Sequence, residues 1–227
     1  MFVGTGSLAQ DQEIFRITPQ YDEDKLLQIA TSATPPVQSE SLLEPDLVEL
    51  STMISNLKYD IRYASTRNFM GMKFYSVEKA YLQRPAADAL VRVALKLGIE
   101  GVGIIVYDAY RPWYVTKMFW EATPDSLKAY VANPDKGSKH NRGCAIDLGL
   151  YDLETGKILP MPSSYDEFTE RAHSNYKGAE KEQTRNRELL KKAMEGEGFQ
   201  VYQYEWWHFD FETWDQYPII NIRFEDL

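Results

Sequence analysis

The chain has 227 residues, of which 44% are hydrophobic and 13% aromatic, enough to bury one sizeable core in a single domain. A formal net charge of −9, with no long cluster of Lys or Arg, excludes nucleic acid as an expected partner. The sequence has no run of about 18 apolar residues, so no membrane span is expected. The single cysteine, Cys144, excludes an internal disulfide.

The amino-terminal region is polar and is predicted to lie outside the main domain. It begins with MFVGTGSLAQDQ, which lacks the basic start and long apolar run of a complete signal peptide, although SLA before QDQ resembles the end of one. The later stretch TSATPPVQSESLLEP is typical of a linker. We therefore divide the chain into an arm at residues 1–45, with a signal remnant and a linker, and a domain at residues 46–227.

The first elements expected in the domain are a helix, a strand and a second helix. Apolar residues at helical spacing predict a helix from about Ala86 to Leu97, with Gly98 as its stop signal. VGIIVYDAY follows as a strand rich in Val and Ile, and Arg111 stands where that strand gives way to a turn. WYVTKMFWEA then predicts the second helix.

The rest of the domain repeats this mixture in a different order. CAIDLGLY alternates over a strand-like length, TRNRELLKKAMEGEGF predicts a helix that ends in glycines, and WWHFDFET alternates again. Strands and helices in this unequal order indicate an α+β fold, with a central antiparallel sheet and helices packed around it.

The stretch SKHNRGCAIDLGL contains one of the three histidines of the chain, His140, seven residues before Asp147. Along the predicted strand, Asp147 shares a face with the small residues Ala145 and Gly149 and points away from the apolar face. Small neighbours leave room for a ligand above the carboxylate. Taken alone, the pair has a second interpretation, as a surface histidine and a turn-capping aspartate.

A second histidine stands beside a carboxylate in YEWWHFDF, where Glu205 precedes His208 by three residues. A straight strand would place these two side chains on opposite faces. We therefore predict a turn or bulge at Glu205 that returns its side chain to His208. Trp206 and Trp207 are interpreted as wall and core residues rather than as a ligand-stacking site.

Two histidines, one aspartate and a spare glutamate match the requirements of zinc hydrolysis. A catalytic zinc ion takes three protein ligands and keeps a fourth position for water, whose pKa it lowers towards neutrality. A carboxylate beside that water accepts its proton as the water attacks a carbonyl. We predict His140, Asp147 and His208 as the ligands of one zinc ion per chain, and Glu205 as the base.

The same stretches carry a resemblance to a known family. SKHNRGCAIDLGLY is similar to the SxHxxGxAxD motif, and EWWH to the ExxWH motif, of the zinc peptidases that include D-alanyl-D-alanine dipeptidases and share a fold with hedgehog domains. YDIRYASTRNFMG, YDAYRP, MPSSYDEFTERAH and EGFQVYQYEWWHF resemble the VanX-type dipeptidase branch, in the expected order from about Leu57 to Asp210. The resemblance implies a hedgehog/DD-peptidase-like fold and hydrolysis of D-Ala-D-Ala.

The resemblance also implies a role for each matching residue. The three predicted zinc ligands and the predicted base match the same positions of the family. Arg111 matches the arginine that stabilises the tetrahedral oxyanion, a role that suits a guanidinium because the attraction strengthens as negative charge develops. Asp166 matches a carboxylate near the free amino group of the substrate, and Ser138 and Tyr63 match positions that line the pocket.

Two other residues of these stretches have competing interpretations. Cys144 stands in the zinc motif where a small residue is expected. A thiol can ligate zinc, but its strand face is opposite that of Asp147, so we favour a small buried core residue. His173 either contacts the pocket or is a structural hydrogen-bonding residue.

Three functions are compatible with these features: a zinc dipeptidase that cleaves D-Ala-D-Ala, a zinc carboxypeptidase that trims longer peptidoglycan stems, and a non-catalytic zinc-bearing binding module. Glu205 and Arg111 favour an enzyme, because a structural zinc ion needs neither a base nor an oxyanion partner. The YDEF and RYAST stretches favour the dipeptidase, whose partner would be a small D-amino-acid dipeptide. The signal remnant favours the bacterial periplasm over the cytoplasm.

Overall fold

The computed structural model of the protein describes residues 14–39 and 41–227. The signal remnant predicted near the amino terminus lies outside the described residues. The helices of the described chain are α1 (Glu23–Ser32), α2 (Arg84–Ile99), α3 (Trp113–Ala122) and α4 (Lys181–Glu195). Its strands are β1 (Leu47–Glu49), β2 (Lys58–Tyr59), β3 (Tyr81–Gln83), β4 (Val102–Asp108), β5 (Ala145–Asp152), β6 (Phe199–Val201) and β7 (His208–Phe211).

Five of these strands form the central sheet, in the order β2–β4–β5–β7–β6, and β1 pairs with β3 in a separate ribbon. The pairs β4–β5, β5–β7 and β6–β7 are antiparallel, whereas β2 runs parallel to β4 at the edge. A parallel pair requires a crossover connection, which β3 and α2 supply between β2 and β4. The predicted α+β fold with a central antiparallel sheet is confirmed, with one parallel pair at its edge.

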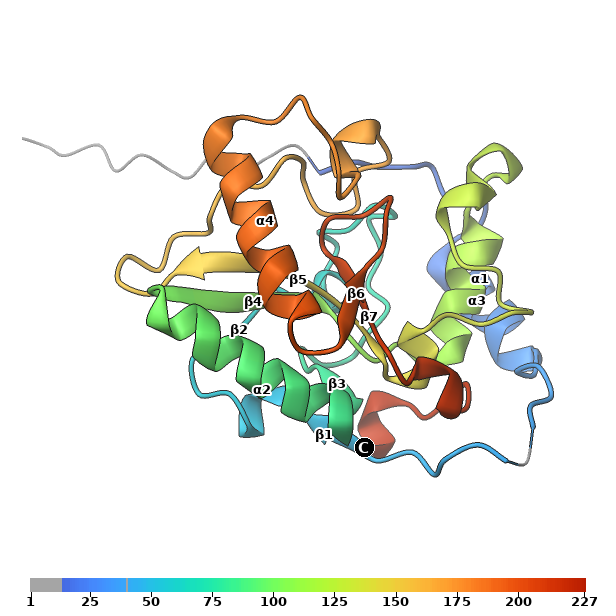
Figure 1. Ribbon diagram of the computed structural model, residues 1–227. Coiled ribbons are helices and arrows are strands. Elements are labelled where there is room, and N and C mark those ends of the chain that lie inside the picture. The colour runs from blue at the N-terminus through green and yellow to red at the C-terminus, as the bar shows by residue number, and fades with distance from the viewer. Residues whose placement is uncertain (1–13, 40) are drawn as a thin grey trace, which may run out of the picture.

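Helices α2 and α4 contact each other and cover one side of the sheet (Figure 1). Helix α2 extends beyond its predicted bounds at both ends. Pro85 lies in its first turn, where a missing N–H leaves no hydrogen bond unmade. The helix continues through Gly98, the predicted stop, and Gly101, with φ of +73°, adopts the left-handed conformation that leads into β4.

The helix predicted over WYVTKMFWEA is confirmed as α3. The arm contains α1, a helix that sequence reasoning did not predict, and it packs against α3 at one end of the molecule (Figure 1). Leu26 and Ala30 on α1 are buried. The division of the chain at residue 45 stays a prediction.

The two faces of β5 have different roles. Ile146, Leu148 and Leu150 are fully buried in the core, as the alternating pattern predicts. On the other face, Gly149 leaves room for the Tyr107 ring, because a Cβ atom there would lie 2.6 Å from the Tyr107 hydroxyl oxygen. The small residue leaves this face of the strand open to side chains from neighbouring segments.

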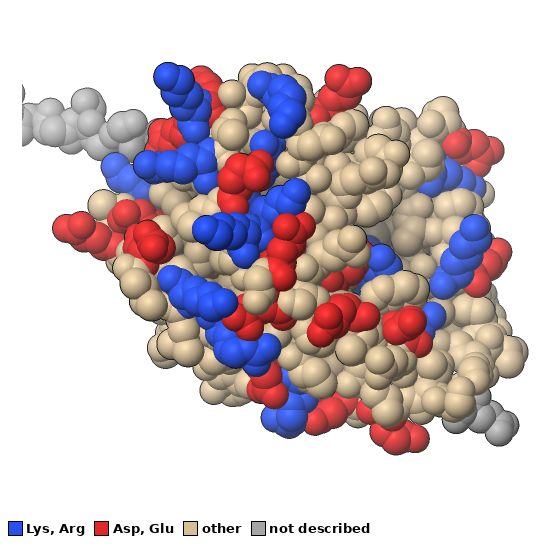
Figure 2. Space-filling model, viewed as in Figure 1, with Lys and Arg blue, Asp and Glu red and all other residues tan. Residues whose placement is uncertain are grey.

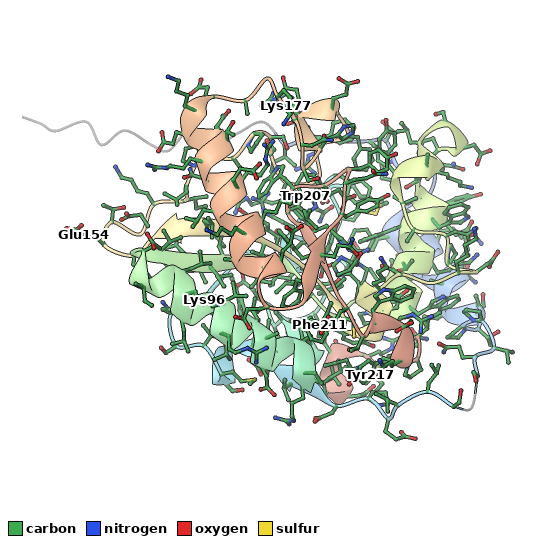
Figure 3. All side chains as sticks on the ribbon, viewed as in Figure 1. Lys96, Glu154, Lys177, Trp207, Phe211 and Tyr217 are labelled. Carbon is green, nitrogen blue, oxygen red and sulfur yellow. The ribbon has the colours of Figure 1, made fainter. Side chains whose placement is uncertain are left out.

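The apolar face predicted for WWHFDF is buried, since Trp207, Phe209 and Phe211 are each at most 6% exposed. Figure 3 shows Trp207 near the middle of the molecule, surrounded by side chains. Trp206 is buried as well, and its indole Nε1 donates to Ser163 Oγ at 2.9 Å. Both tryptophans are wall and core residues, as predicted.

A bulge in β4 decides which of its side chains reach the open face of the sheet. Val106 pairs with Leu148 and Asp108 pairs with Asp147, so Tyr107 is the extra residue between them. In a regular strand, Val106 and Asp108 would share a face. The bulge instead brings Asp108 to the face of Asp147, away from the core.

Charges of both signs are distributed over the surface. Figure 2 shows Lys and Arg interspersed with Asp and Glu on the face that it presents, without a large area of one sign. Ion pairs between Arg84 and Asp46 and between Lys117 and Glu121 are examples. None of the helices in the described ranges is long and apolar enough to cross a membrane.

Candidate active site

Asp147 and His208 lie side by side because β5 and β7 pair with these two residues directly opposite each other. Directly opposed residues on one face of a sheet bring their side chains within contact distance. His140 comes from the 3₁₀ turn His140–Arg142, immediately before β5. Gly143, with φ of +66°, reverses the chain between this turn and β5, where a side chain would collide with β1.

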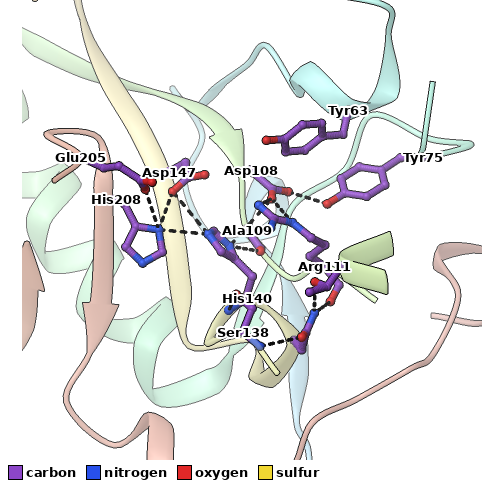
Figure 4. Close-up of polar contacts among 12 residues, drawn as sticks. Tyr63, Tyr75, Asp108, Ala109, Arg111, Ser138, His140, Asp147, Glu205 and His208 are labelled. Carbon is purple, nitrogen blue, oxygen red and sulfur yellow. Dashed lines mark hydrogen bonds and ion pairs between the residues drawn. The ribbon is translucent and has the colours of Figure 1, made fainter. Parts of the chain in front are cut away.

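The three predicted metal ligands point at one another (Figure 4). His140 Nε2 lies 3.1 Å from His208 Nδ1 and 3.4 Å from Asp147 Oδ1, and His208 Nδ1 lies 3.0 Å from Asp147 Oδ1. A tetrahedral zinc ion with bonds near 2.0–2.1 Å would separate its ligand atoms by about 3.3 Å. The three atoms His140 Nε2, Asp147 Oδ1 and His208 Nδ1 form a triangle whose sides fit an ion of this size. We call this set the metal triangle, and its three residues form a candidate metal site.

Hydrogen bonds on the outer nitrogen of each imidazole set its orientation. His140 Nδ1 donates to the Ala109 carbonyl oxygen at 2.6 Å, so Nε2 carries the lone pair. His208 Nε2 donates to Asp210 Oδ1 at 2.9 Å, which leaves Nδ1 facing the triangle. His140 Nε2 and His208 Nδ1 thus both face the space between the three ligands, where a metal ion would accept their lone pairs in place of a proton.

The electrostatics of the triangle also favour a cation. Burial lowers the pKa of His208, but hydrogen bonds to Asp147 and Asp210 outweigh burial and raise it well above its ordinary value. Burial raises the pKa of Asp147, but His140 and His208 outweigh burial and hold it well below its usual range. Tyr165 donates to Asp147 Oδ2 at 2.8 Å and leaves Oδ1 for the triangle. The site therefore favours an ionised carboxylate beside positive charge.

Glu205 lies in the turn that joins β6 to β7, so the predicted turn is confirmed. Its N–H donates to the Tyr202 carbonyl at 3.2 Å, and its own carbonyl accepts from the His208 N–H at 3.4 Å. Its Oε2 lies 3.7 Å from His208 Nδ1, beside the triangle but not part of it (Figure 4). Burial raises the pKa of Glu205, which makes this carboxylate a better proton acceptor.

Arg111 follows β4 and is held by the buried carboxylate of Asp108. Its Nε and Nη2 donate to Asp108 Oδ2 at 2.9 and 2.6 Å, and the Tyr75 hydroxyl donates to Asp108 Oδ1 at 2.8 Å (Figure 4). The guanidinium carbon lies 5.2 Å from the ring centre of Tyr63 and 4.8 Å from that of Phe119. Among the described residues, no acceptor contacts Arg111 Nη1. This nitrogen is therefore free to donate to a molecule bound in the site.

Asp166 is a buried carboxyl group without a cationic partner. Its Oδ2 accepts a hydrogen bond from the Tyr63 hydroxyl at 3.0 Å, and no Lys, Arg or His of the described chain forms an ion pair with it. Burial, with repulsion from Asp147, raises the pKa of Asp166 well above its ordinary value. Such a group is expected where the missing cation belongs to a ligand.

One cavity of about 670 Å³ connects these groups, a size within the usual range of ligand sites. Ser138 reaches it beside His140, and its Oγ accepts from the His140 N–H at 3.2 Å. The cavity is lined by all eight site residues predicted from the sequence, namely Tyr63, Arg111, Ser138, His140, Asp147, Asp166, Glu205 and His208. The structure brings these residues together, and their individual roles stay predictions.

The two residues with competing interpretations are also placed. Cys144 is fully buried, and burial raises the pKa of its thiol to about 12. The preference for a core residue is therefore confirmed. His173 lines the cavity, with its ring centre 5.2 Å from that of Tyr204.

Sequence reasoning missed four residues that support the site. Asp108 stands in the YDAYRP stretch, and Asp210 shares a strand face with His208, so both had a signal in the sequence. Lys139 forms an ion pair with Asp210 at 2.5 Å, and Tyr165 reaches Asp147. Lys139 and Tyr165 also stand in the stretches SKHNRG and MPSSYDEF, but their partners lie 71 and 18 residues away, so no local pattern indicates these contacts.

A His–Asp–His site with an adjacent spare carboxylate and an arginine in one cavity has the composition of a metal-dependent hydrolase. Residues 44–224 match the peptidase M15 family, described as D-ala-D-ala dipeptidase. The chain belongs to this family of metallopeptidases. Both the resemblance noted from the motifs and the predicted enzyme class are confirmed.

Two bacterial relatives carry a matching name. The D-alanyl-D-alanine dipeptidase of Escherichia coli (strain K12) is 36% identical over 179 residues, which cover 79% of this chain and 91% of that protein. The protein of the same name from Enterococcus faecalis (strain ATCC 700802 / V583) is 33% identical over 188 residues, with coverages of 74% and 92%. The match to the solved structure of the LdcB LD-carboxypeptidase has a TM-score of 0.42 at 17% identity and covers 84% of this chain and 80% of that one. Both relatives are bacterial, and the compartment of this protein stays a prediction.

Proposed function

We propose that the protein hydrolyses the dipeptide D-Ala-D-Ala with one zinc ion per chain. The observation that carries this proposal is the convergence, on one cavity, of the metal triangle and the unpaired carboxyl group of Asp166. A free dipeptide has an ammonium group at one end, which Asp166 can pair while the peptide bond lies beside the metal. Membership of the D-ala-D-ala dipeptidase family supports the same substrate.

His140 Nε2, Asp147 Oδ1 and His208 Nδ1 would hold the zinc ion. Two imidazole nitrogens and one carboxylate oxygen belong to the ligand types that catalytic zinc takes, and three ligands leave a position for water. When bound, zinc supplies Lewis-acid activation of water and of the peptide carbonyl. The outer contacts to Ala109 and Asp210 keep both imidazoles in the tautomer that binds metal.

Glu205 is the proton carrier in the proposed reaction. It accepts a proton from the attacking water and returns it to the nitrogen of the departing amino acid. Its position beside the triangle supports this role, as does a pKa raised by burial. The turn between β6 and β7 fixes its backbone beside the three ligands, with Oε2 3.7 Å from His208 Nδ1.

Arg111 stabilises the negative charge that develops on the carbonyl oxygen. Asp108 fixes the plane of its guanidinium through two hydrogen bonds, and the rings of Tyr63 and Phe119 flank it. A donor that is already oriented needs no reorganisation when the charge appears. The buried ion pair with Asp108 therefore supports a role in catalysis as well as in folding.

Asp166 binds the substrate ammonium group, with Tyr63 as its hydrogen-bonding neighbour. Burial makes an unpaired carboxylate costly, and an ammonium group removes this cost by supplying the opposite charge. We place Ser138 among the substrate-contacting residues because it lines the same cavity next to a metal ligand.

The test compares free with N-acetylated D-Ala-D-Ala, using the zinc-loaded protein. Acetylation removes the ammonium group and leaves Asp166 unpaired, at a cost of about 3–5 kcal/mol for a broken buried pair. We therefore expect kcat/KM to fall by more than about 100-fold for the acetylated dipeptide. Asp166→Asn should lose most of this discrimination, because it removes the charge that recognises the ammonium group.

Two other outcomes would overturn the proposal and identify the alternative. Equal turnover of free and acetylated dipeptide would indicate a carboxypeptidase that accepts longer peptidoglycan stems. Stoichiometric zinc binding without turnover of either substrate would indicate a non-catalytic binding module.

A further inference from the structure

The wall of the cavity away from the metal is a cluster of aromatic rings. Phe69, Tyr130 and Phe168 all line the cavity. The ring centre of Phe168 lies 5.3 Å from that of Phe69 and 4.8 Å from that of Tyr130. The rings of Phe168 and Tyr130 are nearly parallel, at 6°. This aromatic wall joins three segments that are far apart in the sequence.

The amino-terminal arm packs against the outside of this wall. The ring centre of Phe15 lies 4.8 Å from that of Phe168. The Ile17 N–H donates to the Phe69 carbonyl at 2.8 Å. Arg16 Nη1 donates to the carbonyl oxygens of Thr66 at 3.0 Å and Asn68 at 3.2 Å. Residues 15–17 therefore hold the segment before Phe69 and the segment of Phe168 together.

Both segments lead directly to the group that we assign to the substrate ammonium. Phe168 follows Asp166 by two residues, and Asp166 has a φ of +58°, a conformation that a residue with a side chain rarely adopts. Such a conformation persists where surrounding contacts hold it. On the other side, the ring centre of Phe69 lies 6.4 Å from that of Tyr63, which donates to Asp166.

The arm lies outside the part of the chain that matches the family. The family match begins at residue 44, whereas the contacts with the aromatic wall come from residues 15–17. The family assignment therefore says nothing about this contact.

We propose that residues 15–17 are a positioning element that holds Asp166 and Tyr63 in place for the substrate ammonium group. The proposal rests on the function proposed above for Asp166. These three residues do not line the cavity, so they act through Phe168 and Phe69. Their loss should loosen the ammonium side of the cavity and leave the metal triangle on β5 and β7 intact.

The experiment uses the full chain with Phe15→Ala, and Phe15→Ala combined with Arg16→Ala. Hydrogen–deuterium exchange, measured without substrate, should become faster in peptides that cover residues 63–71 and 163–170, and stay unchanged in β5 and β7. KM for D-Ala-D-Ala should rise on the order of tenfold, the ratio that corresponds to loss of an aromatic pair. Zinc content and kcat should stay unchanged.

Two further variants separate positioning from general destabilisation. Val37→Ala removes an apolar side chain of the same arm that is fully exposed, and it should change neither exchange nor KM. Phe15→Leu keeps an apolar contact with Phe168 and should restore most of the wild-type KM. It also keeps the test valid if the double variant does not fold.

The possible failures are distinguishable. If hydrogen–deuterium exchange in residues 63–71 and 163–170 is unchanged in the Phe15→Ala variants, the positioning role is overturned, whatever the substrate. Faster exchange with an unchanged KM would show that the arm supports the fold but not substrate binding, and would also overturn it. If the wild-type protein does not cleave D-Ala-D-Ala, the proposed function fails, and with it the link to the ammonium group, while exchange still reports whether the arm holds these segments.

Discussion

The metal side of the cavity is built on paired strands, whereas the side that carries Asp166 is built on irregular chain. Asp147 and His208 are direct cross-strand partners, and hydrogen bonds fix the neighbouring side chains. Asp166 and Tyr63 are 103 residues apart in the sequence and meet through one hydrogen bond. Rigid strands hold a site more tightly than loops do. Changes on the metal side should therefore abolish the reaction, and changes on the Asp166 side should weaken substrate binding.

The two buried aspartates of this cavity also differ in their charge environment. His140 and His208 hold the pKa of Asp147 well below its usual range despite burial. Burial and repulsion from Asp147 raise the pKa of Asp166 well above its usual range. When the environment shifts the pKa values of two carboxyl groups in opposite directions, the two groups are suited to different roles. These environments support the proposed roles, with Asp147 as a metal ligand and Asp166 as the partner of the substrate ammonium group.

The largest effect is expected from the metal ligands. Removing one ligand leaves two, too few for a catalytic zinc site, so His140→Ala, Asp147→Ala and His208→Ala should each lose most of the metal and the activity. Elemental analysis of the purified protein measures the loss, starting from about one zinc ion per chain. His173→Ala, at a histidine that lines the cavity outside the triangle, should retain its metal. Full zinc in any of the three ligand variants would show that the site is misassigned.

The next largest effect is expected at Glu205, on the same side of the cavity. Glu205→Gln preserves the shape of the side chain but removes its basicity, so kcat should fall by about 10²–10⁴-fold. Zinc content should stay at the wild-type value, because Glu205 is not part of the triangle. Glu212→Gln, at an exposed position, is the matched control. An active Glu205→Gln enzyme would remove this residue from the mechanism.

Variants of Arg111 test whether this residue, which follows β4 on the metal side of the cavity, acts on the reacting atoms. Arg111→Ala should lower kcat by about 100- to 1,000-fold, the effect of losing one donor to a developing oxyanion. KM should change far less, because the attraction grows only as negative charge develops. Arg111→Lys should restore part of the rate, since it keeps the charge but not the planar group. A higher KM with unchanged kcat would make Arg111 a ground-state anchor.

The metal side was predictable from the sequence because local rules determine it. Strand alternation places Asp147 opposite the apolar residues, and the failure of alternation at Glu205 correctly indicates a turn. The bulge at Tyr107 was not predictable, since nothing in a regular strand pattern indicates which residue is extra. The stretch YDAYRP points to Asp108, but without the bulge its contact with Arg111 cannot be inferred.

Asp166 and Tyr63, on the other side of the cavity, were predicted only through the family resemblance. Its geometry depends on contacts between distant segments, such as the hydrogen bond from Tyr63 and the packing of Phe15 on Phe168. The polar composition of the arm predicts a segment outside the domain, yet Leu26 is buried and α1 packs against α3. A short apolar stretch in a polar segment has too little periodicity to indicate a helix.

Asp210 should have a smaller effect than the ligands, because it acts through His208. Asp210→Ala removes the acceptor for His208 Nε2 and should weaken zinc binding by about 10- to 100-fold, measured by competition with a chelator. Asp210→Asn keeps an acceptor without the charge and should lie between Ala and wild type. Asp215→Ala, at an exposed aspartate, is the control. Unchanged zinc affinity in Asp210→Ala would show that the strand alone orients His208.

The smallest effect is expected on the irregular side, at Tyr63. Tyr63→Phe removes the hydroxyl that donates to Asp166, a hydrogen bond to a charged group worth about 1.5 kcal/mol, so KM for D-Ala-D-Ala should rise about tenfold. Zinc content and kcat should change far less, because the Tyr63 hydroxyl reaches the metal ligand Asp147 only through Tyr165, whose hydroxyl lies 3.4 Å away. Tyr59→Phe, on β2, removes a hydroxyl whose partner is Ser51 and serves as the control. A lower kcat with an unchanged KM would place Tyr63 at the reacting atoms and show that the two sides of the cavity do not act separately.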